Sequence, residues 1–300
     1  MNTLITGGTG FIGTALCARL QAEGHRVTVL SRNPARAQAL FHGQVEIIGA
    51  LDALTEANAP EAIINLAGEN LAGHRWNARW REAFVRSRVG ITEQLLLYIA
   101  RTPRKPRVLV SGSAVGYYGA RGDEALSEDS PPGREYQSEL CVAWEAVARQ
   151  AESHGLRVCL LRTGIVLGNN GGALKSMLLP FRLGLGGHLG DGRQWMSWIH
   201  RDDLIGIILH LLRHESLRGP YNGTAPEPVT NREFARSLGA ALRRPVLMPL
   251  PGFLVRLLVG GMAHLLLTGQ KVLPARVQSA GYEFRHPRLP AALTQILGSS

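Results

Sequence analysis

The chain has 300 residues, enough for one large α/β domain or for a nucleotide-binding domain with a smaller lobe. Its formal net charge is +10, but the basic residues are scattered and form no run, so we expect no nucleic-acid partner. Cys17, Cys141 and Cys159 form no close pair and have no metal-type spacing, which favours free thiols in a reducing compartment. The first strand begins at once, without a signal-peptide pattern, and we therefore expect a cytoplasmic protein.

The first predicted elements are a short apolar strand, a glycine turn and a helix from Phe11 to about Glu23. Gly7, Gly10 and Gly13 have the spacing that allows a sharp turn, a diphosphate close to the backbone and a helix packed tightly on the sheet. The N–H groups at the helix start form an anion site. Glycines in a turn can also be needed only for its backbone conformation. The strand before these glycines and the helix after them, however, predict dinucleotide binding.

The residues after the second strand, Val27 to Leu30, indicate which dinucleotide is bound. An NAD-binding strand commonly ends in a carboxylate that binds the ribose 2′-hydroxyl. Here that position holds Ser31, followed by Arg32, whose guanidinium can bind a 2′-phosphate. The hypothesis is therefore NADP(H). Arg36 is a further candidate for the phosphate, or an exposed charge on the next helix.

Strands and helices then alternate along the chain, as in a parallel sheet with right-handed crossovers. We predict short helices at Pro34–Leu40 and Leu51–Ala57, long helices at 75–100 and Glu135–Ser153, and strands at Val45–Ile48, Ala62–Leu66, Val108–Ser111 and Val158–Arg162. The predicted fold class is α/β: a Rossmann-type, doubly wound parallel sheet with a smaller C-terminal α/β lobe.

Small residues follow the fourth strand. Because the carboxyl ends of parallel strands hold the ligand in such a sheet, we expect Leu66, Ala67 and Gly68 to border the adenosine. A helix-capping turn is the alternative. On the next helix, Arg86 and Arg88 are both candidates for reaching back to a phosphate.

The segment from Gly168 to Gly192 is rich in glycine, which suits either a mobile loop over a ligand or a closely packed connection. A helix from Leu204 to Arg213 follows, with Asp202 or Asp203 as its predicted N-cap. His210 and His214 have the spacing of a zinc-binding helix, but no third ligand accompanies them, so we expect no metal site.

The predicted organisation is a Rossmann domain at 1–220, with 170–195 on the substrate side, and a small substrate-side lobe at 221–300. The lobe contains a helix at Asn231–Leu242, capped by Thr230 or Asn231. Its most apolar stretch, Phe253 to Leu267, is too short and too interrupted to span a bilayer. We therefore expect a buried or interface helix there and no membrane partner.

Several motifs together resemble an atypical epimerase family within the extended short-chain dehydrogenases/reductases, the group of bacterial YfcH-like proteins. They are Thr6 to Gly13, Leu66 to Asn70, Ser111 to Ala114, Leu140 to Glu145, Gly186 to Gln194, Trp198 to Asp203 and Gly281 to Arg285. The resemblance covers nearly the whole chain and implies a family-specific C-terminal module from about residue 250.

The resemblance implies that NADP contacts fall at the strand ends and the glycine turn. The residues are Gly7, Thr9, Gly10, Phe11, Ile12, Ser31, Arg32, Leu66, Ala67, Glu69, Arg88 and Val166. Between the two helix arginines, it favours Arg88.

The resemblance fails at the catalytic pair of the wider superfamily, a tyrosine with a lysine four residues later. Ser113 matches the superfamily's serine, but Gln137 stands in the tyrosine position and Cys141 in the lysine position. Tyr136, one residue from the expected place, and Tyr117 or Tyr118, close after Ser113, are the substitutes that we consider for the proton donor, and each also has a purely structural interpretation. An unassisted tyrosine is a poor base at neutral pH.

Two functions are compatible with these observations. The first is an NADP(H)-dependent oxidoreductase or nucleotide-sugar-type epimerase that acts on a small polar carbonyl or sugar-like substrate. The second is a catalytically silent protein that binds or senses NADPH and acts through a protein partner. The long helices at 75–100 and 135–153 are also compatible with a homodimer.

Overall fold

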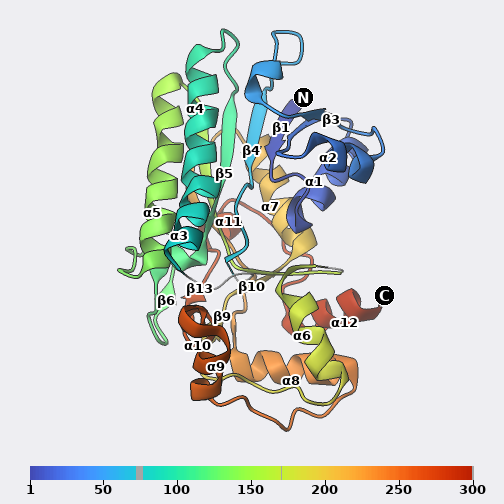
Figure 1. Ribbon diagram of the computed structural model, residues 1–300, viewed down its shortest axis with the longest axis vertical. Coiled ribbons are helices and arrows are strands. Elements are labelled where there is room, and N and C mark those ends of the chain that lie inside the picture. The colour runs from blue at the N-terminus through green and yellow to red at the C-terminus, as the bar shows by residue number, and fades with distance from the viewer. Residues whose placement is uncertain (72–76, 170, 299–300) are drawn as a thin grey trace.

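A seven-stranded parallel sheet forms the centre of the computed structural model, which describes residues 1–71, 77–169 and 171–298 (Figure 1). Its strands are β1 (Asn2–Thr6), β2 (Arg26–Leu30), β3 (Glu46–Ile48), β4 (Ala62–Asn65), β5 (Val108–Ala114), β7 (Arg157–Thr163) and β11 (Gly219–Gly223). They are arranged in the order β11-β7-β5-β4-β1-β2-β3. Because β1 pairs with both β2 and β4, the order reverses beside β1, where sheets of this kind bind ligands.

Helices cover both faces of the sheet and confirm the predicted Rossmann-type fold (Figure 1). Leu4 and Ile5 are consecutive in β1 and fully buried on opposite faces, so each contributes to a different core. Ile5 belongs to the core shared with α1 (Phe11–Ala22), α2 (Pro34–Phe41) and α7 (Arg201–Arg213), and Leu4 to the core shared with α4 (Ile91–Arg101) and α5 (Tyr136–Arg149).

The long helix predicted at 75–100 is divided into three segments, α3 (Ala78–Val85), a π-helical segment η3 (Arg86–Gly90) and α4. Its predicted first two positions, 75 and 76, lie outside the described residues. Asn77 caps α3 by accepting a hydrogen bond from the Trp80 N–H. The wide turn of η3 carries Arg88, and such π segments are often found at functional sites. Only one 3₁₀ turn, η1 (Leu51–Ala53), forms where a partial helix to Ala57 was predicted.

The glycine-rich segment is a packed connection, one of the two predicted alternatives. It contains a helix, α6 (Gly172–Arg182), between β8 (Ile165–Leu167) and β9 (Trp195–Met196). The Cβ of any larger residue at Gly171 would overlap the Phe11 ring, and at Gly187 it would overlap the Met248 carbonyl. These glycines are therefore required for close approach.

The lower part of the molecule has a hydrophobic core of its own (Figure 1). Leu167, Leu174 and Trp198 come from the first half of this part, and Phe234 and Leu293 from the second. The remaining elements are η4 (Val115–Tyr118), β6 (Ala125–Leu126), η5 (Gln150–His154), β10 (Trp198–His200), β12 (Val229–Thr230), α8 (Asn231–Leu242), α9 (Gly252–Val259), η6 (Gly260–Met262), α10 (Ala263–Leu267), β13 (Lys271–Val272), α11 (Ala275–Ser279) and α12 (Leu289–Gly298).

The domain boundary at 220/221 stays a prediction, and it falls inside β11 of the main sheet. Thr230 caps α8 in a capping box with Glu233, as one of the two predicted caps. None of the helices among the described residues has the length and apolar character needed to cross a bilayer.

Candidate active site

The glycine turn after β1 has the geometry of a diphosphate cradle. Gly7 has φ +70°, and a Cβ there would lie 2.5 Å from the Leu66 carbonyl oxygen. Gly13 is buried, and a Cβ on it would overlap the Gly7 carbonyl. At Gly10 the nearest atom to such a Cβ is the Gly7 oxygen at 3.2 Å, so the space beyond it stays open. Two of the glycines therefore permit packing, and the third leaves room for a ligand.

The start of α1 presents its first N–H groups without a side-chain cap. Gly10 is the N-cap, and no acidic residue lies in the first turn. Thr9 is exposed beside Gly10, while Phe11 and Ile12 are half-buried. Uncapped N–H groups at a helix N-terminus form an anion site.

Arg32 follows β2 and extends over the same end of the sheet. Its side chain is 92% exposed, and its Nη2 lies 3.6 Å from a carboxylate oxygen of Glu69, which follows β4. Ser31 is half-buried, and its hydroxyl donates to the Asn33 carbonyl. The structure thus brings Arg32 and Glu69, two residues from different strand ends, together as an ion pair.

Arg88 holds the turn after β4 in place. Its Nη2 donates to the Glu69 carbonyl at 2.9 Å, and a Cβ on Gly68 would lie 3.1 Å from its guanidinium carbon. Burial lowers the pKa of Arg88. Ser87 accepts from the Glu69 N–H at 3.0 Å. Ser87 and Arg88, which both belong to η3, therefore hold the same loop.

A buried polar chain positions the strand ends beneath this loop. The Thr6 hydroxyl donates to Asn65 at 2.6 Å, and the Asn65 amide donates to the Thr92 hydroxyl at 2.8 Å. Thr6 Oγ1 also accepts from the Ala67 N–H at 3.2 Å, and Leu66 and Ala67 are half-buried. These hydrogen bonds hold the turn from Leu66 to Gly68 in place, and its contact with the adenosine stays a prediction.

Ser113, at the end of β5, belongs to a buried charged network. Its hydroxyl donates to Glu145 Oε1 at 2.7 Å. Arg162, at the end of β7, donates from Nε and Nη2 to the two oxygens of Glu145, each at 2.8 Å. The side chains of Arg162 and Glu145 are 3% and 5% exposed. Burial by itself lowers the pKa of Arg162, but the hydrogen bonds and charge of Glu145 outweigh it and raise that pKa.

Tyr117 and Tyr136 differ in how far their hydroxyls are engaged. The guanidinium of Arg162 lies 3.4 Å from the centre of the Tyr117 ring, next to Ser113's partner Glu145. Among the described residues, the Tyr117 hydroxyl has no hydrogen-bond partner. Tyr118 is fully buried, and its hydroxyl donates to Asn222 at 2.6 Å. The Tyr136 hydroxyl donates to the Arg81 carbonyl at 3.1 Å, and burial raises its pKa, opposed by the charges of Arg81 and Arg88. The structure brings Ser113 and Tyr117 together and leaves Tyr136 beside α3.

The two positions that depart from the superfamily pattern are both buried. Gln137 is 4% exposed, and its Nε2 has no hydrogen-bond partner among the described residues. Burial, followed by the charge of Glu145, raises the pKa of Cys141 to about 11. A neutral thiol here supplies no positive charge to a neighbouring proton donor.

Val166 lies in β8, which continues beyond the sheet and pairs with β10. A Cβ on Gly172 would lie 2.7 Å from its carbonyl oxygen. Arg201, the first residue of α7, places its guanidinium 5.1 Å from the centre of the Phe11 ring. The Phe11 ring packs against Gly168 and Gly172, which follow Val166, and thus connects the start of α1 to the segment after β8.

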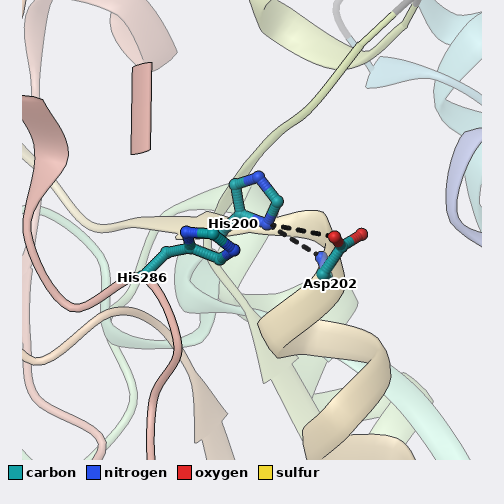
Figure 2. Close-up of side chains that lie close together, drawn as sticks. All are labelled: His200, Asp202 and His286. Atoms are coloured by element: carbon teal, nitrogen blue, oxygen red, sulfur yellow. Dashed lines mark hydrogen bonds and ion pairs between the residues drawn. The ribbon is translucent and has the colours of Figure 1, made fainter. Parts of the chain in front are cut away.

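The predicted N-cap of α7 is wrong, because His200 takes that role. His200 Nδ1 accepts from the Asp202 N–H at 3.1 Å (Figure 2). Asp203 is fully buried and instead accepts the N–H groups of Arg285 and His286, at 2.8 and 2.9 Å. Asp203 therefore connects α7 to the C-terminal segment.

His200, Asp202 and His286 form a compact cluster whose potential metal-binding atoms lie within 4.8 Å of one another (Figure 2). The ring nitrogens of His200 are already engaged, since Nδ1 accepts from Asp202 and Nε2 lies 3.0 Å from Gln295 Oε1. The His286 ring stacks on it at 3.9 Å between centroids. We therefore interpret the cluster as a connection between α7, α12 and the C-terminal segment.

Comparison with known proteins identifies the family. Residues 3–222 match the model of the NAD dependent epimerase/dehydratase family, and residues 250–296 match the Domain of unknown function (DUF1731). The chain belongs to the NAD dependent epimerase/dehydratase family. The chain is 43% identical over 304 residues to epimerase family protein SDR39U1 of Bos taurus, with 99% of this chain and 100% of the relative covered. It is 34% identical to epimerase family protein YfhF of Bacillus subtilis, with 99% and 98% covered.

A solved relative extends this similarity to the structure. The crystal structure of human epimerase family protein SDR39U1 (isoform 2) with NADPH matches with a TM-score of 0.91 and 41% identity, covering 100% of both chains. The predicted family resemblance is thus confirmed.

Sequence reasoning missed the roles of Glu145 and Arg162. Arg162 ends an otherwise apolar strand, and Glu145 follows Trp144 on the inner face of a helix. Opposite charges at two positions that face the core are the signal that identifies such a buried pair.

Proposed function

We propose that this protein binds NADP(H) and catalyses hydride transfer to or from a small polar substrate, a carbonyl compound or the corresponding sugar-like alcohol. The glycine turn with open space beyond Gly10, and the uncapped start of α1, fit a diphosphate. Arg32, exposed beyond β2 where an NAD-binding chain has a carboxylate, fits the 2′-phosphate. NADPH in the crystal structure of the human relative supports the same cofactor for this chain.

We assign the cofactor contacts to the residues around this space. Gly7, Gly10 and Gly13 permit its close approach, and Arg32 binds the phosphate of the adenosine. The remaining contacts come from the glycine turn and the start of α1, the residues after β2 and β4, η3 and β8: Thr9, Phe11, Ile12, Ser31, Leu66, Ala67, Gly68, Glu69, Arg88 and Val166. When bound, the nicotinamide supplies the hydride donor or acceptor.

The observation that carries the catalytic part of the proposal is the buried hydrogen bond from Ser113 to Glu145. Because Ser113 donates to a carboxylate, its oxygen, which also interacts with the Cys141 thiol, keeps a lone pair with which to accept a proton from a substrate hydroxyl. As the substrate hydroxyl transfers its proton to Ser113, Ser113 transfers its own to Glu145. Arg162 compensates the charge of Glu145 before that transfer and holds it in place. Carbonyl reduction runs the same proton path in reverse.

Tyr117 is the second group that we place at the substrate oxygen. Its ring packs on Arg162, which holds it next to the Ser113 network. Its hydroxyl has no hydrogen-bond partner among the described residues. Tyr136 is held by the Arg81 carbonyl, so we assign it a structural role. The sequence-based hypothesis left Tyr117, Tyr118 and Tyr136 open; we leave Tyr118 out because it is fully buried with its hydroxyl on Asn222.

Turnover of NADPH with a panel of carbonyl compounds, and of NADP⁺ with alcohols and nucleotide sugars, tests the proposal. We expect Ser113→Ala and Tyr117→Phe each to lower kcat by about 10² to 10⁴ while NADPH binding is kept. Tyr136→Phe is the matched control, and we expect it to keep most of the activity. Loss of activity in Tyr136→Phe with normal Tyr117→Phe would reverse the assignment.

The second candidate function is NADPH binding or sensing through a protein partner. It is favoured by the neutral, buried Cys141 and by Gln137 at the positions of the superfamily's lysine and tyrosine. An absence of turnover with every substrate, together with a complex that forms only with NADPH, would support it over the enzyme. The homodimer stays a prediction, with Leu97 of α4 and Val142 of α5 exposed at 70% and 39%.

A further inference from the structure

The C-terminal lobe carries an exposed apolar face that the candidate active site does not use. It consists of Leu247, Met248, Phe253, Leu257 and Leu258, whose exposure ranges from 56% to 76%. Single exposed apolar residues are ordinary, but a cluster of this kind marks an interaction surface. We call these five residues the apolar face.

The helix at the centre of the apolar face makes little contact with the rest of the lobe. In α9, eight residues long, Val255 is the one buried residue. Beside it, the segment 248–250 forms backbone hydrogen bonds with the loop after α6: Leu250 donates to His188, and Gly190 donates to Leu250, both at 2.9 Å. Two further exposed leucines, Leu183 at 65% and Leu185 at 57%, lead into this loop. The apolar face thus lies on a backbone held in place by paired segments.

The stretch of sequence that contains the apolar face is basic. No aspartate or glutamate occurs between Glu233 and Glu283. The same stretch contains six basic residues, Arg236, Arg243, Arg244, Arg256, Lys271 and Arg276, of which Arg276 forms an ion pair with Asp129. One carboxylate, Asp191, lies in the loop that pairs with Leu250, so the basic residues outnumber it. A second copy of the chain would bring like charges together at this face, whereas an anionic surface is attracted to it.

The composition of the face favours a lipid surface over a protein partner. From 247 to 259, Arg256 is the one residue with a polar side chain. Protein interfaces carry about one hydrogen bond per 100 to 200 Å², which this stretch has few groups to form. A membrane surface requires apolar side chains at the acyl boundary and cations at the headgroups.

We propose that the apolar face binds the surface of a membrane that contains anionic phospholipid, with α9 lying in the interfacial plane. Eight residues of helix reach about 12 Å, far less than the roughly 30 Å of a bilayer core, so the contact is peripheral. We expected no membrane partner because no stretch of the sequence can span a bilayer. A short helix that lies on the membrane surface does not need to span it.

The position of α9 is compatible with an accessible cofactor site. Figure 1 shows α9 and α10 at the lower end of the molecule, with α1 and the strands of the main sheet in the upper part. A membrane at the lower end therefore leaves the start of α1 uncovered.

Vesicle flotation tests this proposal with the full chain. We expect capture by phosphatidylcholine vesicles that contain about 30% phosphatidylglycerol at about 0.1 M salt, and little capture by phosphatidylcholine alone. Leu257→Asp places a charge in the apolar face at an already exposed position, and we expect it to weaken capture on the order of tenfold. Leu97→Asp is the matched control, since Leu97 is 70% exposed on α4, and we expect it to float like the unchanged chain.

Three outcomes would overturn the proposal. The first is that the unchanged chain stays unbound with both vesicle types, and the second is that Leu257→Asp floats as well as Leu97→Asp. The third is a concentration-dependent dimer, seen by sedimentation, that Leu257→Asp dissociates, because the occupant would then be a second copy. NADPH affinity measured on the same variants is expected to be unchanged, so the result is independent of the proposed enzymatic function.

Discussion

Replacing Glu145 by glutamine tests the buried charge pair that supports Ser113. The substitution keeps the size of the side chain but removes its negative charge, so Arg162, with its side chain 3% exposed, loses its counterion. Two hydrogen bonds of 2.8 Å from Arg162 and one of 2.7 Å from Ser113 converge on the carboxylate, and an amide accepts through one oxygen only. Leaving a buried charge without its partner costs about 3–5 kcal/mol. We expect the free energy of unfolding to fall by that amount.

Urea unfolding followed by fluorescence measures this change, with an unchanged m-value as the sign that the unfolded state is the same. The double variant Glu145→Gln with Arg162→Met removes both charges, and we expect it to recover part of the loss. Arg32→Ala removes an arginine that is 92% exposed, and we expect its effect on unfolding to stay within about 0.5 kcal/mol. A loss below about 1 kcal/mol in Glu145→Gln would refute the reasoning, since the pair would then not be a closed, desolvated unit.

Two further predictions concern the His200 cluster and the glycine turn. Burial, followed by the charge of His286, lowers the pKa of His200, so the folded state favours its neutral form. The stabilisation by neutral His200 is therefore complete above about pH 6.5, the pKa of an unfolded histidine, and is lost as the pH falls through the lower pKa of the folded state. We expect the free energy of unfolding in urea to depend less on pH in His200→Asn. An unaltered pH dependence would contradict this prediction. Gly13→Ala is expected to lower the free energy of unfolding by about 1–3 kcal/mol, because the new Cβ would lie 2.6 Å from the Gly8 Cα. Gly90→Ala, with nothing within 4 Å of the added methyl group, is expected to stay within about 0.5 kcal/mol, and equal effects of the two substitutions would contradict the packing argument.

The fold was predictable because its signals are local. The glycine spacing at Gly7 to Gly13 and the alternation of short apolar strands with helices depend on neighbouring residues, and they predicted the parallel sheet. The strand ends that approach one another at one edge follow from the same topology. For that reason Arg32 and Glu69, 37 positions apart, lie 3.6 Å apart. Arg32 was predicted from its place after β2 and Glu69 from the family resemblance, and their contacts with the cofactor stay predictions.

The errors arose where a distant segment determines the role of a residue. Asp203 looked like a helix cap, but its carboxylate accepts N–H groups from residues more than 80 positions later, and His200 caps α7 instead. The glycines near 170 and 187 left a mobile loop and a packed connection open, because only their distant partners Phe11 and Met248 distinguish the two. Arg162 and Glu145 were overlooked because each is an ordinary residue in its own segment. Their importance follows from the buried ion pair that they form between β7 and α5.

The central claim is that the glycine turn and Arg32 bind NADP(H). Calorimetric titration of the purified chain with NADPH and with NADH tests it most directly, and we expect NADPH to bind at least about tenfold more tightly. Arg32→Ala is expected to remove this preference while NADH binding remains, and Arg36→Ala is the matched control on the neighbouring helix. Absence of NADPH binding, equal binding of both dinucleotides by the unchanged chain, or an undiminished preference in Arg32→Ala would contradict the account.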